Sequence, residues 1–266
     1  MHKIIGVVLL LSQGVFCQDY YSEFLLSCQT NDTINQLEIL TQWEIESPQD
    51  AELFVSYFNY HFIKSRQEVL SLSTNKLDSD ENLILKDSLG ETAGYLGSQI
   101  RYDEAELKKG LDKIDEGISL YPNRLDMRFG KIYVFGQIPD WERFTAEIIK
   151  TIQYSSINNN NWTWENDDEE YGGKDDFLLD IQSYQLQLYN TRNDYLLKNM
   201  REIAEEVIKY YPNHVPSLSN ISTTYVLAGK YDKAIEVLLQ AEKIDCLLYT
   251  SPSPRDLSTS RMPSSA

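Results

Sequence analysis

The chain is poor in cysteine and histidine, with three of each among 266 residues. Cys17 and Cys246 fall in terminal segments that are set apart below, so Cys28 alone remains and an internal disulfide is excluded. His61 and His214 lack the spacing of zinc ligands and are typical of helix-face or capping residues. No glycine-rich phosphate loop is present. We therefore expect no catalytic residue, no metal and no cofactor, and a protein that is not an enzyme.

Positive charge is also scarce. The chain has 24 lysine and arginine residues against 41 aspartate and glutamate residues, which gives a net charge of −17. A surface this acidic repels nucleic acid and anionic lipid. Both are therefore excluded as partners.

Hydrophobic runs are too short to span a bilayer, which needs about 20 apolar residues. The run Ile4–Leu11 follows a short basic start and has the length of the apolar part of a signal peptide. We predict that residues 1–17 are a cleaved signal peptide and that the mature chain is not inserted in a membrane. Lipidation of Cys17 is the alternative, disfavoured because Phe16 stands where lipoprotein signals carry a small residue. Export without disulfides indicates a periplasmic or cell-envelope protein of bacterial type.

The C-terminal residues differ in character from those before them. Residues 246–256, CLLYTSPSPRD, resemble the in-frame translation of a transposase-type sequencing adapter, and residues 260–266, SRMPSSA, resemble its other end. This segment has no helical periodicity. We expect residues 246–266 to be a non-native tail, with a natural disordered tail as the alternative, and the authentic gene to continue beyond Asp245.

Sustained alternation of apolar and polar residues is missing, so the sequence predicts an all-α fold. Ser47 and Pro48 are expected to start a buried helix that is apolar almost all round. Residues 66–100 are the least regular part, because three glycines interrupt any long helix. Residues 18–100 are therefore described only as an N-terminal helical region. Other helices are expected through 34–43, over 102–120, around 129–133, from 139, and at about 175–192, 195–210, 215–228 and 231–244.

The clearest pattern lies in residues 215–245, VPSLSNISTTYVLAGKYDKAIEVLLQAEKID. Gly229 ends the first helix of this unit, where a left-handed conformation is cheap only for glycine. Ala234 and Ala241 stand where the two helices approach most closely. The unit resembles the tetratricopeptide-repeat (TPR) family, although Ser222 replaces the glycine that the family favours. The resemblance implies structural roles for Leu218, Ile221, Tyr225, Gly229, Tyr231, Ala234, Leu238 and Ala241.

Weaker copies of the pattern occur upstream. Pro122 and Pro212 each close a unit, and Gly110 and Gly117 occupy the two small-residue positions of the first. The resemblance therefore covers about residues 101–245. Because one helical hairpin cannot bury both of its apolar faces, we expect the hairpins to stack as a TPR-like α-solenoid. An ordinary helical bundle with one chance match is the alternative.

A repeat array of this family implies a scaffold or adaptor. Its concave face, built by the first helix of each hairpin, would bind a protein or peptide partner. The predicted contacts are the outward polar residues Ser219, Asn220 and Thr223 of the clearest unit.

The alternative function rests on the polar loop at residues 158–174. Its side chains Trp162 and Trp164 could stack on a sugar, which would make the chain an exported carbohydrate-binding or carbohydrate-processing protein. The acidic residues of the loop are consecutive, whereas Ca²⁺ loops space their ligands alternately, so no metal is predicted there.

Overall fold

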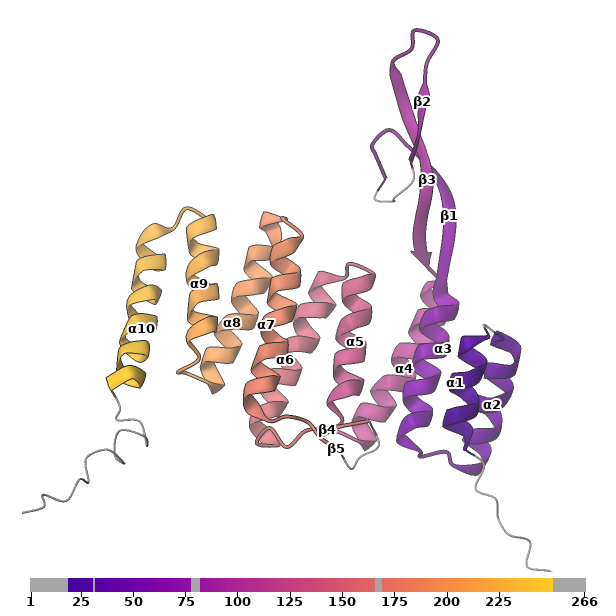
Figure 1. Cartoon of the computed structure of the whole chain (residues 1–266), viewed down its shortest axis with the longest axis horizontal. Helices are drawn as coiled ribbons and strands as arrows, with labels where there is room; N and C mark the ends of the chain where they lie inside the picture. Colours follow the sequence, from indigo (N-terminus) through magenta and orange to yellow (C-terminus); the bar gives the residue numbers. More distant parts are fainter. Residues whose placement is uncertain (1–18, 31, 78–81, 166–168, 251–266) are drawn as a thin grey trace, which may run out of the picture.

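The chain folds as an array of helical hairpins from which a small β-sheet projects (Figure 1). The structure, a computed structural model, describes residues 19–30, 32–77, 82–165 and 169–250. The expected all-α solenoid is confirmed. The helices are α1 (Tyr20–Gln29), α2 (Thr33–Glu46), α3 (Ala51–Ser65), α4 (Glu104–Leu120), α5 (Leu125–Gln137), α6 (Trp141–Ile157), α7 (Lys174–Asn190), α8 (Leu197–Tyr210), α9 (Val215–Leu227) and α10 (Tyr231–Thr250), with a 3₁₀ turn at Asp194–Leu196.

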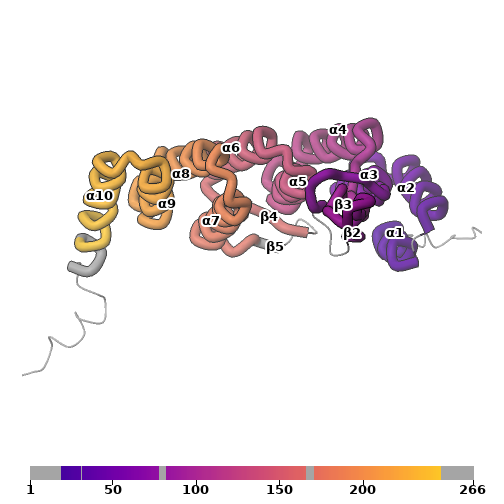
Figure 2. The backbone as a smooth tube through the Cα atoms, turned by 90° about the horizontal axis from the view of Figure 1, so that it is seen from above, coloured from indigo at the N-terminus to yellow at the C-terminus, as the bar shows by residue number. Residues whose placement is uncertain are grey.

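Consecutive helices pack in pairs, α1 with α2, α3 with α4, and so on to α9 with α10. Figure 2 shows α4, α6 and α8 in one row and α5, α7 and α9 in a second row beside it. The second row therefore contains the first helix of each of the last three hairpins. The array bends so that α1 and α10, at its two ends, lie on the side of the second row.

Aspartate side chains start several helices by accepting backbone N–H groups that have no partner within the helix. The helix α3 shows this and corrects one prediction. It begins at Ala51, because Asp50 accepts the N–H of Glu52 at 3.0 Å, whereas Ser47 ends the preceding helix α2. The expected deep burial of α3 is confirmed. Equivalent aspartate caps are Asp19, Asp32, Asp103 and Asp140.

Glycines allow α4 to approach α3 closely. A Cβ atom added at Gly110 would lie 3.1 Å from the Cβ of His61, and one at Gly117 would lie 2.9 Å from the Cβ of Phe54. These are the two small-residue positions predicted for the first repeat unit. Its first helix is therefore α3, and the predicted boundary at residue 100 falls between the two helices of one hairpin.

Three strands separate α3 from α4, and the sequence did not predict them. They are β1 (Arg66–Ser73), β2 (Asn82–Lys86) and β3 (Thr92–Tyr102), in the antiparallel order β1-β3-β2. The sequence of β2, NLILK, does not alternate, and the two buried positions of β3 are the glycines Gly94 and Gly97. A Cβ at Gly94 would meet the carbonyl oxygen of Ser73 at 2.9 Å, so glycine here permits close strand packing. Of the three glycines that interrupt any long helix here, Gly94 and Gly97 thus belong to β3, and Gly90 lies in the turn between β2 and β3.

The C-terminal helix α10 continues to Thr250 and so includes the first five residues of the predicted non-native tail. Residues 251–266 lie outside the described part of the chain, as do the residues 1–17 of the predicted signal peptide. Within the described residues, every helix is too short or too polar to cross a bilayer.

Candidate functional site

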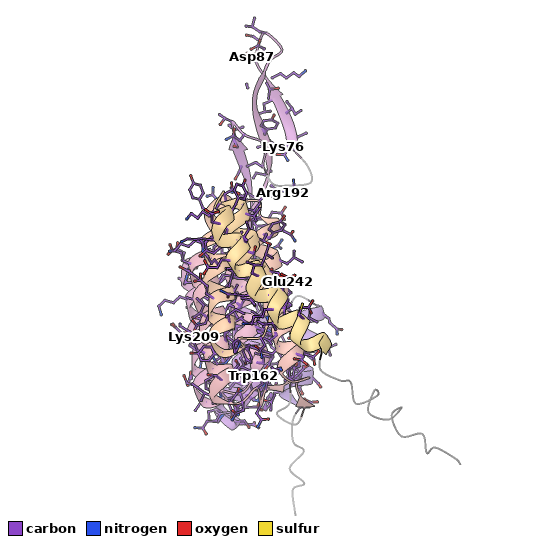
Figure 3. All side chains as sticks on the ribbon, turned by 90° about the vertical axis from the view of Figure 1, so that its left-hand side faces the viewer. Lys76, Asp87, Trp162, Arg192, Lys209 and Glu242 are labelled. Carbon is purple, nitrogen blue, oxygen red and sulfur yellow. The ribbon has the colours of Figure 1, made fainter. Side chains whose placement is uncertain are left out.

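The loop between α6 and α7 is attached to the body by its tryptophans. Trp162 is only 1% exposed and lies low in the body of the molecule (Figure 3). Its ring stacks on Phe177 at 5.6 Å between centroids and contacts Tyr154 at 5.7 Å. A ring buried in this way presents no face to a sugar. The structure therefore gives Trp162 a packing role in place of the expected ligand contact.

The second tryptophan of this loop, Trp164, is half-buried. It stacks on Tyr171 at 5.4 Å and meets Phe129 edge-on at 6.3 Å. The backbone of the loop is fixed as well, because the N–H of Thr163 donates to the carbonyl of Asn123 at 3.0 Å. Both tryptophans thus attach the loop to the body. The acidic residues Asp167 and Asp168 of the loop lie outside the described residues.

The residues of the clearest repeat unit differ in how deeply the structure buries them. The side chains of Leu218, Ile221, Ala234 and Ala241 are buried. Gly229 has the expected positive φ of 69° in the turn. Ser222 is also buried and donates to the carbonyl of Ala234 at 3.1 Å, which ties α9 to α10. The ring of Tyr225 contacts the cations of Arg201 and Lys233. Tyr231 and Leu238 are exposed. The prolines of the two upstream units, Pro122 and Pro212, lie in the turns after α4 and α8.

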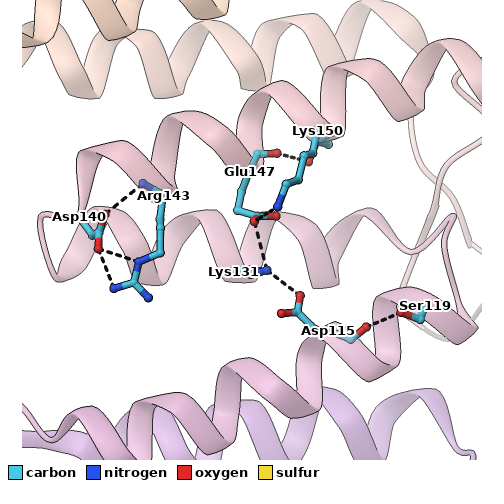
Figure 4. Close-up of polar contacts among 8 residues, drawn as sticks. Asp115, Ser119, Lys131, Asp140, Arg143, Glu147 and Lys150 are labelled. Atoms are coloured by element: carbon cyan, nitrogen blue, oxygen red, sulfur yellow. Dashed lines mark hydrogen bonds and ion pairs between the residues drawn. The ribbon is translucent and has the colours of Figure 1, made fainter.

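A buried lysine links three helices at the centre of the array (Figure 4). The ammonium of Lys131 on α5 lies 2.6 Å from Asp115 on α4 and 3.2 Å from Glu147 on α6. Glu147 also pairs with Lys150 at 2.7 Å. Because both carboxylates are engaged by cations, this cluster holds helices together and does not present a free acid–base pair.

A hollow of about 490 Å³ lies between α7 and α9, which belong to the second row of helices. We call it the α7–α9 groove. Its wall on α7 consists of Leu179, which is 67% exposed, together with Leu186 and Tyr189. These side chains recur at helical spacing, so they form one exposed apolar stripe. Asn220 and Thr223 of α9 line the opposite side.

The floor of the α7–α9 groove contains three carboxamides. Asn220 donates through Nδ2 to Oε1 of Gln182 at 2.6 Å and to Oε1 of Gln185 at 3.1 Å. Gln185 is 1% exposed, and the side-chain nitrogens of both glutamines have no hydrogen-bond partner among the residues that the structure describes. A buried donor without an acceptor costs about 1–3 kcal/mol. Both nitrogens are covered in the free chain, so a ligand's carbonyl oxygen would remove that cost if the carboxamides turned toward the groove.

Charge is nearly absent from the α7–α9 groove. Among the described residues that line it, Asp180 alone is ionisable apart from tyrosine. Asp180 accepts a hydrogen bond from the hydroxyl of Tyr171, and burial together with this bond raises the pKa of Tyr171. No cation is present to bind a carboxylate. The lining favours neutral, partly apolar ligands.

Two of the three predicted contacts, Asn220 and Thr223, therefore line a groove, while Ser219 does not. The wall and floor on α7 were missed: Leu179, Gln182, Gln185, Leu186 and Tyr189. Their signal was present as a second stripe on a helix whose core face is formed by Phe177, Leu178, Ile181 and Leu188.

Comparison with known proteins finds distant likeness among solved structures. No protein-family model matches the chain, and no curated protein is significantly similar to it. Among solved structures, MamA protein is 9% identical over 85% of this chain and 90% of its own, with a TM-score of 0.38. YrrB, described as a TPR protein with an unusual peptide-binding site, is 12% identical over 91% of each chain, also with a TM-score of 0.38. Likeness at this level carries no argument about function.

Proposed function

We propose that the protein is an interaction scaffold that binds an extended peptide segment of a partner in the α7–α9 groove. The unpartnered amide nitrogens of Gln182 and Gln185, beneath an exposed apolar wall, are the observation that carries this proposal. An extended peptide supplies main-chain carbonyl oxygens as acceptors and an apolar side chain for the wall. An extended peptide therefore provides both the hydrogen-bond acceptors for the glutamine amides and the apolar contact for the wall.

The partner segment is expected to be internal to its chain. A free C-terminal carboxylate would face Asp180 with no cation among the groove's lining residues. A neutral backbone avoids this repulsion. Apolar residues on the segment would contact Leu179, Leu186 and Tyr189.

Export of the scaffold remains part of the proposal. It rests on the basic start, the apolar run and the shortness of residues 1–17. Given export, the absence of a possible disulfide in the mature chain favours a bacterial envelope over animal secretion. Detecting the processed N-terminus by mass spectrometry after expression in a bacterial host would test it. A cytoplasmic, unprocessed product would contradict export and leave the groove proposal intact.

Peptide binding is tested with an array of ten-residue peptides in which each position is varied, probed with the full chain. We expect binding to depend on one or two apolar positions and to be unaffected by amidation of the C-terminus. Gln185→Leu should weaken binding about fivefold, because one hydrogen bond to a carbonyl contributes about 1 kcal/mol. Leu186→Glu should abolish it through desolvation and repulsion of the apolar side chain.

Leu120→Glu is the matched control, because it also places a carboxylate at a half-exposed leucine, on α4 and away from the groove. Its binding should equal that of the wild type. Equal binding by Leu186→Glu would remove the groove as the site. Absence of any selective peptide binding by the wild type would contradict the function itself.

A further inference from the structure

The projecting sheet has one face that is rich in leucine and one face of mixed character. In an antiparallel sheet, residues paired across strands point to the same side. The register pairs Leu72 with Leu96 and Leu96 with Leu83, so these three side chains form one row across all three strands. Leu70 is 80% exposed, and Leu72 and Leu83 are nearly as open. We call this side the leucine face. Its apolar side chains are Leu70, Leu72, Leu83, Leu85, Leu96 and Ile100, and the same side also carries Glu68 and Ser98, whose hydroxyl donates to the Glu68 carboxylate. The other side carries Gln67, Ser71, Gln99 and Arg101 together with Val69, Ile84 and Tyr95.

The body of the molecule does not cover the leucine face, because the sheet projects away from the helices (Figures 1 and 3). Asp87 marks its far end in Figure 3. A contiguous exposed apolar surface of this kind is typical of an interaction site. Hydrocarbon is excluded as its environment, because β1 and β2 are open edges whose unpaired backbone groups cannot be buried in lipid.

The shape of the leucine face is complementary to itself. The row Leu72–Leu96–Leu83 forms a ridge, and on the central strand it is flanked by the small residues Ser98 and Gly94. A two-fold axis lying between the ridge and one of these troughs would place each copy's ridge over the other copy's trough. Two such sheets then pack face to face as the two layers of a β-sandwich.

The charge distribution favours contact between two copies through their sheets over contact through their helical bodies. Residues 66–102 carry four basic and six acidic side chains, a net charge of −2, whereas the whole chain carries −17. Two copies joined through their sheets keep their acidic helical bodies apart. Contact through the bodies would bring like charges together.

We infer that the leucine face is the contact surface of a homodimer of this chain. The apolar part of the leucine face consists of six side chains. The area that they can bury is small beside a standard interface of about 800 Å² per partner. The dimer is therefore weak, with a dissociation constant on the order of micromolar. Because the contact is apolar and the bodies repel, salt strengthens association by screening the repulsion.

Sedimentation velocity of the full chain over a concentration series tests this inference. The wild type should pass from monomer to dimer, and at a lower concentration in about 0.3 M salt than in about 0.02 M salt. Leu83→Lys should remain monomeric throughout the series, with at least a tenfold loss of affinity.

Ile84→Lys is the control, because Ile84 is the next residue of β2, is comparably exposed, and lies on the opposite face. It should dimerise as the wild type does, and circular dichroism should match for all three proteins. Equal dimerisation of Leu83→Lys would overturn the inference. So would a wild type that stays monomeric at the highest attainable concentration, which would leave a different protein as the partner of this face.

Discussion

Single atoms decide how closely α3 and α4 pack. Gly117 lies against the Cβ of Phe54 and the sulfur of Met127, at 2.9 and 3.1 Å from an added Cβ. Gly130, also helical, would place its Cβ 3.4 Å from the flexible ring edge of Phe58. The two glycines therefore differ in the space available to them, although both lie within helices.

Gly117→Ala is expected to lower the free energy of unfolding by about 1–3 kcal/mol, because overpacking outweighs the gain in helix propensity. Gly130→Ala should leave it unchanged or raise it by up to about 1 kcal/mol, since ordinary contact lets the propensity gain prevail. Urea unfolding followed by circular dichroism measures both. Equal stability of the two variants would show that α3 and α4 do not need the glycine contact.

The residues of the α7–α9 groove show where sequence reasoning stops. Asn220 and Thr223 could be predicted because the clearest repeat fixes which side of α9 faces outward. Gln185 could not, because a glutamine on a helix ordinarily lies at the surface, and its burial depends on α9 crossing above it. The sequence of one hairpin does not indicate which of its side chains the next hairpin will bury.

At the scale of elements, Glu106 joins the two helices of the first predicted unit. Its carboxylate on α4 lies 2.7 Å from Lys109 and 2.9 Å from Nδ1 of His61 on α3. The hydrogen bonds from Lys109 and His61 lower the pKa of Glu106 to about 2. Because the folded value lies below the unfolded one, Glu106 stabilises the fold above about pH 4.5, and this contribution disappears as the pH falls toward 2.

Glu106→Gln should therefore cost about 1 kcal/mol of unfolding free energy at pH 6, and progressively less as the pH falls from about 5 toward 2. Urea titrations of wild type and variant at several pH values give the difference directly. Glu104→Gln, on the exposed side of the same turn, is the control for removing one carboxylate from the start of α4. A Glu106→Gln difference that is constant with pH would contradict the assigned charge interaction.

The sheet is an insertion that the helical array does not require. Gln67 pairs with Arg101, so the two ends of the insertion lie beside each other. The N–H of Asp103 donates to the carbonyl of Ser65 at 2.8 Å, which closes the gap between α3 and α4 below the sheet. This insertion also explains why α3 could not be recognised from the sequence as the partner of α4.

Replacing residues 68–100 by Asn-Gly, which favours a tight turn between paired strands, should preserve the helical circular dichroism. The midpoint of thermal unfolding should change by only a few degrees. The leucine face is removed, so this variant should also sediment as a monomer. Loss of helical signal would instead show that the sheet supports the core.

At the scale of the whole molecule, repetition determines what each position buries. Ile114 on α4, Ile148 on α6 and Ala204 on α8 are each 0% exposed. Leu238 occupies the corresponding position on α10, 34 residues after Ala204, and is 47% exposed. The resemblance to a repeat implied an inward Leu238, but in the described residues no hairpin packs against that side of α10. Burial of a side chain at this position therefore depends on a following hairpin that packs against it.

Appending a second copy of residues 212–245 directly after Asp245 should supply that neighbour. In an array stabilised by nearest-neighbour contacts, the addition should raise the midpoint of unfolding, because Leu238 and the exposed Ile235 and Leu239 gain cover. Leu238→Ala separates this effect from mere length. It should cost less than about 1 kcal/mol in the parent chain, where the side chain is half-exposed, but about 2–5 kcal/mol in the extended chain, where it is buried. Urea unfolding of the four proteins gives both values, and an equal cost in the two backgrounds would mean that the added hairpin does not stack in register.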